Sequence, residues 1–137
     1  MYKKTIKFED YNGNEREEDF FFNLNESEVT KLELRTPGGL TAMMQRIVQK
    51  LDSQQIIDTF EELIRQSYGE KSDDGREFRK SAEISDRFMH TEAYDKLFME
   101  LCTDSKAASE FFNSILPQKL RNQMNQPKPI PAPANAG

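Results

Sequence analysis

Apolar residues recur at helical spacing in a series of short stretches after residue 25. Positions i, i+3, i+4 and i+7 lie on one face of a helix, so each stretch has one face that must be buried. Three of these stripes are Leu40, Met43, Met44, Ile47, Val48 and Leu51; Ile56, Ile57, Phe60, Leu63 and Ile64; and Tyr94, Leu97, Phe98, Leu101 and Cys102. None approaches the ~20 apolar residues that span a bilayer, so the pattern predicts a compact helical domain and no membrane partner.

Capping residues and helix breakers set the ends of about five to six short helices. Asn25 and Glu28 form a capping box at the start of the first helix, which Pro37 and two glycines end near Arg35. Ser81 and Thr91 are predicted to cap two later helices. The remaining predicted caps are Asp52 or Ser53 and Thr103 or Asp104, and Pro117 ends the last helix, which carries Ala107, Ala108, Phe111, Phe112, Ile115 and Leu116.

The first 22 residues have a different pattern. Residues 2–10 and 15–22 read as two strands around the turn Tyr11-Asn12-Gly13-Asn14. Asn-Gly between such runs is a strong β-hairpin signal. A hairpin alone is marginally stable in water, so we expect its apolar face to pack on the helices.

The register of this hairpin depends on its loop. A two-residue loop of Asn12 and Gly13 would place Ile6 opposite Asp19. A three-residue loop with Asn14 in the left-handed region places Ile6 opposite Phe20 and gathers the apolar side chains on one face. We therefore expect the three-residue loop.

Two polar segments complete the organisation. Residues 68–81 hold two glycines and many charges, which predicts a loop anchored by Phe78. Residues 126–137 hold four of the six prolines, which favours an extended tail.

The predicted fold is mainly α (α+β) with a single folded domain. Its parts are an N-terminal β-hairpin at residues 1–23, a compact set of amphipathic helices at residues 25–117, and a flexible, disordered Pro-rich tail at residues 118–137.

Charge is distributed unevenly along the chain. Three of the 19 Lys and Arg residues, and none of the 24 Asp and Glu residues, lie after Pro117, so residues 1–117 carry a net charge of −8 and the tail +3. An acidic body argues against nucleic acid as a partner. The densest basic run, Arg76, Arg79 and Lys80, has acidic residues among it, which is typical of a solvated surface.

Residues able to carry out chemistry are few. His90 stands at a predicted helix end, and Cys102 lies on an apolar stripe, where cysteine acts as a small buried hydrophobe. Gly38 and Gly39 lack the Lys-Ser/Thr ending of a phosphate loop. The one acidic group suited to a metal is Glu70, Asp73, Asp74 and Glu77, on which a small enzyme or nuclease would depend. We predict no catalytic, cofactor-binding or metal-binding residues, and a protein that is not an enzyme.

The single cysteine excludes an intrachain disulfide, and no apolar stretch near the start resembles a secretory signal, so we expect a cytoplasmic protein. The methionines at 43, 44, 89 and 99 lie at or beside helical stripes, which favours core packing over a binding groove. Phe20 and Phe22 fall on one face of their strand and Phe21 on the other. At least one of the three is thus left for a partner or for a covering helix, and the edge strand offers a site for another chain.

Several longer runs carry a family resemblance. They are TPGGL at 36–40 with the QRIV helix after it, FEELIRQSYGEKSDDGREFRKS at 60–81, TEAYDKLFMELCTD at 91–104, AASEFFNSILP at 107–117 and YNGNEREEDFFFNL at 11–24. Together they resemble the tail assembly chaperones of long-tailed (siphovirus-type) phages and prophages of Gram-positive bacteria. The resemblance covers about residues 1–117, and none of its runs holds a catalytic signature.

The resemblance implies a protein that binds the tape measure protein, keeps it soluble and helps to recruit subunits of the major tail (tube) protein. It also implies location in the host bacterial cytoplasm and absence from the mature virion. Self-association, and contacts with the tape measure protein in multiple copies through the hairpin and the amphipathic helices, are further hypotheses. A small acidic helical protein is suited to covering the apolar faces of a long helical chain while charge keeps the complex soluble. The alternative is a structural virion protein of the head–tail connector or tail completion type.

Overall fold

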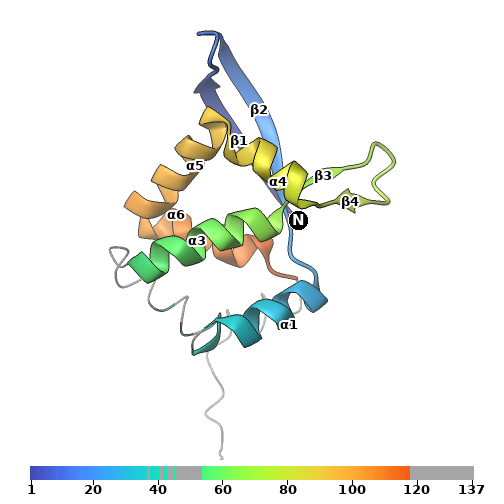
Figure 1. Ribbon diagram of the computed structural model, residues 1–137, viewed down its shortest axis with the longest axis vertical. Helices are drawn as coiled ribbons and strands as arrows, with labels where there is room; N and C mark the ends of the chain where they lie inside the picture. The colour runs from blue at the N-terminus through green and yellow to red at the C-terminus, as the bar shows by residue number, and fades with distance from the viewer. Residues whose placement is uncertain (37, 41, 43–44, 46–53, 118–137) are drawn as a thin grey trace, which may run out of the picture.

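A computed structural model describes residues 1–36, 38–40, 42, 45 and 54–117 (Figure 1). They form an α+β fold with a four-stranded antiparallel sheet, in the order β1-β2-β3-β4, and five helices. The elements are β1 (Tyr2–Glu9), β2 (Glu15–Phe22), α1 (Glu26–Arg35), α3 (Gln54–Ser67), β3 (Tyr68–Lys71), β4 (Phe78–Arg79), α4 (Ala82–Met89), α5 (Glu92–Thr103) and α6 (Ser105–Ile115).

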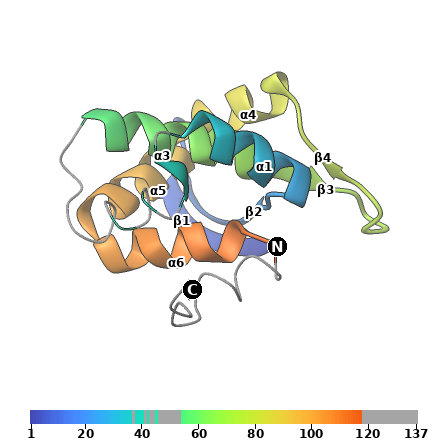
Figure 2. The same ribbon diagram turned by 90° about the horizontal axis from the view of Figure 1, so that it is seen from below.

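The helices pack on one face of the hairpin. Helices α5 and α6 contact β1, α4 contacts β3, and α3 contacts α4 and α5. Figure 2 shows α3 and α6 in separate layers with α5 at one side. The even-numbered apolar residues of β1 and β2 face the helices and are buried, namely Ile6, Phe8, Phe20 and Phe22.

An aromatic cluster lies at the centre of the core. Phe22 is fully buried, and its ring centroid lies 5.3 Å from that of Phe111, 5.6 Å from Tyr68 and 5.7 Å from Phe88. Tyr68 and Phe88 stack at 4.3 Å. These rings come from β2, β3, α4 and α6, so the cluster joins the sheet to the helices.

The hairpin is confirmed, but its predicted register is wrong. Ile6 lies opposite Glu18, two residues away from the expected Phe20. The loop has three residues, as expected, but it spans residues 11–13, and Gly13 adopts the left-handed conformation at φ +83°. A shift of two residues keeps every side chain on its face, so the predicted apolar face is correct.

Asp10 accounts for the position of the loop. Its Oδ1 accepts hydrogen bonds from the backbone N–H groups of Asn12 and Asn14, both at 2.9 Å, and its Oδ2 accepts from Arg16 Nε at 2.6 Å. The backbone N–H of Gly13 donates to the Asp10 carbonyl at 2.9 Å. Aspartate is favoured at the first position of such a turn because its side chain bonds to the backbone that follows.

We expect the hairpin to loosen in acid through Asp10. The hydrogen bond from Arg16, with those from the Asn14 and Asn12 backbone, lowers the pKa of Asp10 below its ordinary value of 3.8. Because the folded-state pKa is depressed, this stabilisation is present above pH 3.8 and is lost as the pH falls through the lower folded-state value. Amide shifts of Asn12 and Asn14 should follow that transition in an NMR titration. An Asp10→Asn variant should lack it, and a midpoint at or above 3.8 in the wild type would contradict this role for the carboxylate.

The prediction of a loop over residues 68–81 is wrong in part. The segment contains β3 and β4, and β3 joins the main sheet where Phe21 pairs with Gly69. Phe78 does anchor it, because its ring lies against Gly69. Pairing with a distant strand overrides the polar local composition.

The predicted helix ends are confirmed where the structure describes them. Glu28 accepts from the Asn25 backbone at 2.8 Å, and the Ser81 and Thr91 hydroxyls accept from the third residue of their helices. Of the two alternatives for the last helix, Asp104 is the cap. Residues 118–137, the cap at Asp52 or Ser53 and most of the 40–51 stripe (Met43, Met44, Ile47, Val48 and Leu51) lie outside the described residues.

Candidate functional site

The outer face of the hairpin is charged, and the two strands differ in the sign of their net charge. Strand β1 carries three lysines and one glutamate, a net charge of +2, whereas β2 carries four acidic residues and one arginine, a net charge of −3. The odd-numbered side chains form the outer face, because side chains alternate along a strand and the buried residues Ile6, Phe8, Phe20 and Phe22 are all even-numbered. Its exposed charged side chains are Lys3, Lys7, Glu9, Glu15, Glu17 and Asp19.

Both strands of the hairpin have an edge without a partner strand among the described residues. Strand β1 is the first in the sheet, and β3 pairs with β2 only at Phe21 and Phe22. Since antiparallel strands alternate the direction of their backbone groups, the outward groups of β2 belong to odd-numbered residues. The pairing of Phe21 with Gly69 and the 2.8 Å bond from Asn23 N–H to the Ser67 carbonyl fit this alternation.

We call the outward backbone of residues 3–7 the β1 edge and that of residues 15–19 the β2 edge. The turn-proximal half of the hairpin extends beyond the helices (Figure 1), whereas α5 lies beside residues 4–7 of β1. A groove of about 290 Å³ runs between β1 and α5, and its lining includes Lys7, Lys96 and Leu97.

A second hollow lies under the hairpin turn. It measures about 370 Å³ and is lined by Tyr11, His90 and Glu92, among others. The Tyr11 hydroxyl donates to Glu92 Oε2 at 3.3 Å, while 76% of the Tyr11 residue remains exposed. His90 is exposed at the C-cap of α4, the helix-end position that its place in the sequence predicts.

The three consecutive phenylalanines separate as predicted. Phe20 and Phe22 are buried in the core, and Phe21 lies half-buried on the outer face. The Lys71 ammonium lies 5.9 Å from the centre of the Phe21 ring. Phe21 is therefore partly covered by β3.

Cys102 and the acidic group have structural contacts. Burial raises the pKa of the half-buried Cys102 thiol, which keeps it protonated and a poor nucleophile. Asp74 accepts from Ser72 Oγ at 2.8 Å, and Glu77 pairs with Arg79 at 2.8 Å. Within the described ranges, no three His, Cys, Asp or Glu side chains are placed to hold a metal ion.

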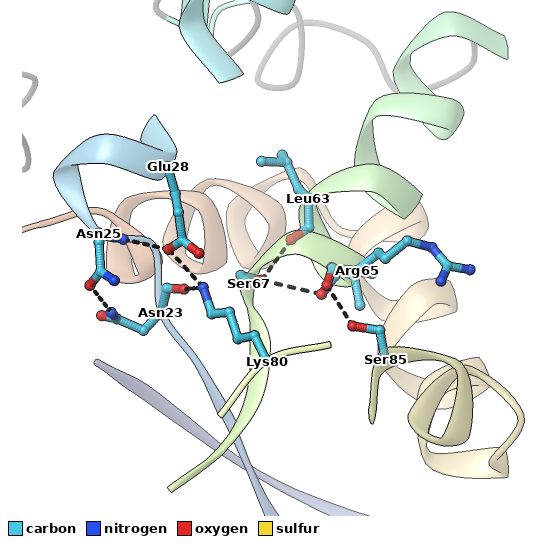
Figure 3. Close-up of polar contacts among 9 residues, drawn as sticks. Asn23, Asn25, Glu28, Leu63, Arg65, Ser67, Lys80 and Ser85 are labelled. Carbon is cyan, nitrogen blue, oxygen red and sulfur yellow. Dashed lines mark hydrogen bonds and ion pairs between the residues drawn. The ribbon is translucent and has the colours of Figure 1, made fainter. Parts of the chain in front are cut away.

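Lys80, from the basic run, ties the sheet to α1 (Figure 3). Its Nζ donates to the Asn23 carbonyl and to Glu28 Oε1, the latter at 2.8 Å. The same Glu28 oxygen accepts from the Asn25 backbone. The Lys80 side chain is only 19% exposed, so its ammonium group stabilises the fold and is not accessible to an anionic partner.

Replacing Lys80 with methionine should lower the free energy of unfolding by about 1–2 kcal/mol, because two charge-assisted hydrogen bonds are lost in a partly screened position. Methionine keeps an apolar stem beside Phe78, over which Lys80 lies at 5.6 Å. Urea denaturation measures the change. Arg79→Met is the control, since its pair with Glu77 is more than half exposed, and we expect a change within about 0.5 kcal/mol. Equal effects of the two variants would contradict the special position of Lys80.

The methionine prediction is only partly correct. Met89 packs against the core, but Met99 on α5 is 51% exposed. Leu34 on α1, which the sequence reasoning did not single out, is 83% exposed. Leu34 and Met99 both lie off the apolar stripe of their helix, so helical spacing alone predicts that they are exposed. Met43 and Met44 lie outside the described residues.

Comparison with known proteins identifies a family. A family model described as phage tail assembly chaperone matches residues 1–136. No curated protein and no solved structure matches the chain significantly. Among the described residues, no helix is long and apolar enough to cross a membrane. A match over almost the entire length indicates a chaperone role in tail assembly with protein partners, and the chain belongs to the phage tail assembly chaperone family.

Proposed function

We propose that this chaperone binds the tape measure protein, keeps it soluble and helps to recruit subunits of the major tail (tube) protein. The match of residues 1–136 to the family carries the proposal. The resemblance of its longer runs supports an origin in siphovirus-type phages or prophages of Gram-positive hosts. It acts without catalysis in the host cytoplasm and leaves before the virion is complete.

The charge distribution supports this function. Residues 1–117 carry a net charge of −8, so copies bound along an apolar chain would repel other complexes and keep the assembly in solution. Exposed apolar side chains on two helices, Leu34 and Met99, are available for contact with a partner.

Co-expression tests the proposal. The tape measure protein from the same genome is produced alone, with this chain, and with an unrelated acidic protein of similar size. We expect a soluble complex that co-purifies only with this chain. Equal solubility in all three cultures, with no complex, would refute tape measure binding.

Mass spectrometry of purified virions tests departure from the assembly. The proposal expects peptides of this chain in the infected-cell lysate and their absence from virions. Stoichiometric presence in virions would instead support a structural protein of the head–tail connector or tail completion type.

A further inference from the structure

We propose that the β1 edge of one copy pairs with the β2 edge of a second copy, so that the sheet continues from molecule to molecule. Each edge offers a row of backbone N–H and C=O groups without a partner strand among the described residues. Such rows are templates for strand addition. The two strands are antiparallel within a copy, so a neighbour placed in the same orientation brings its β2 antiparallel to β1.

Electrostatic interactions favour pairing of a β1 edge with a β2 edge over pairing of two identical edges. Two β1 edges side by side would bring Lys3 and Lys7 of each copy together, and two β2 edges would bring acidic residues together. Like charges opposite one another destabilise a strand pair, whereas opposite charges stabilise it. Lys3 and Lys7 have no ion pair with any described residue, so both are available to a neighbour.

The outward direction of the odd-numbered residues fixes the register. With Thr5 opposite Glu17 of the second copy, Lys3 meets its Asp19 and Lys7 meets its Glu15. A shift of two residues one way would place Lys3 opposite Phe21 of the second copy, which already pairs with Gly69. A shift the other way would place Lys7 opposite Gly13 and lose one ion pair.

The contact is heterologous, since it joins two different edges. A copy bound through its β1 edge keeps its β2 edge available, so addition can continue without closing. The inference concerns the chaperone alone and does not depend on which protein it escorts.

Single-cysteine variants test the pairing. In the full chain with Cys102→Ser, one variant carries Thr5→Cys and the other carries Glu17→Cys with a short affinity tag. In a hydrogen-bonded antiparallel pair the two Cα atoms are about 5.5 Å apart, which is within disulfide range. Mixing them under mild oxidation at high protein concentration should give mostly the mixed dimer. Absence of the mixed dimer, or homodimers of either variant in equal yield, would overturn the proposal.

Charge exchange provides the second arm. Lys3→Glu with Lys7→Glu in the Thr5→Cys protein should reduce mixed-dimer formation about tenfold, because two attractive pairs become repulsive. Glu15→Lys with Asp19→Lys in the Glu17→Cys protein should restore it. Circular dichroism and thermal melting establish that each variant is folded. A yield of mixed dimer that is unchanged by both charge exchanges would refute the pairing.

Discussion

Phe22→Ala is expected to lower the free energy of unfolding by about 3–5 kcal/mol, the range for removing a buried aromatic ring. Phe22 is fully buried at the end of β2. Its ring lies within 6.4 Å of four others, contributed by Tyr2, Tyr68, Phe88 and Phe111. Because these rings belong to the sheet and to two helices, they cannot all close around the cavity that alanine would leave.

Guanidinium or urea unfolding, followed by circular dichroism, measures the loss. Phe21→Ala is the matched control, because the residue is adjacent and its ring is on the half-exposed outer face. We expect it to cost about 1 kcal/mol, mainly from partial burial and the contact with Lys71. A control that costs as much as Phe22→Ala would show that the strand faces are assigned wrongly.

The same strand shows how far sequence reasoning reaches. Alternation of apolar residues identifies the buried face, because a shift by one residue would expose Phe20 and Phe22. It does not distinguish registers that differ by two residues, which bury the same side chains. That choice depends on hydrogen bonds to the Asp10 side chain, a feature that the apolar pattern does not contain.

Long-range pairing is the other step that local patterns miss. Residues 68–81 read as a loop, since glycines and charges dominate them. The strand β3 forms because Tyr68 packs in the core and Gly69 pairs with Phe21, forty-eight positions earlier. Helices were easier to predict because their caps and stripes are local, as at Ser81 and Thr91.

The candidate interaction surface, too, could be predicted only in part from the sequence. The opposite charges of KKTIK and EREED are visible in the sequence. That they border two unpaired edges follows only from the strand order, with β1 outermost and β3 covering β2 at two residues. Exposure of Leu34 and Met99 follows from helix geometry, but their role depends on a partner that the chain alone does not reveal.

Gly69→Val should be the most damaging change outside the aromatic cluster, with a loss of about 3 kcal/mol from overpacking. A Cβ at Gly69 would lie 2.7 Å from Phe78 Cε2 and 2.9 Å from the Arg79 backbone oxygen. The ring can rotate away, but the backbone of β4 can move only by leaving β3. We therefore expect β4 to detach and thermal unfolding to occur at a lower temperature.

A double-mutant cycle with Phe78→Ala separates the two contacts. Removing the ring should recover part of the loss at Gly69→Val and leave the part caused by the Arg79 carbonyl. Glu70→Val, exposed on the same strand, is the control for placing valine in β3, and we expect a change within about 0.5 kcal/mol. Strictly additive effects of Gly69→Val and Phe78→Ala would mean that the ring and the glycine do not touch, which would contradict the close packing of β3 against β4. If the effects are not additive and Gly69→Val still destabilises the protein without the Phe78 ring, the close approach of the β4 backbone is what requires glycine. The sequence alone does not reveal this requirement, because it reads as a polar loop there.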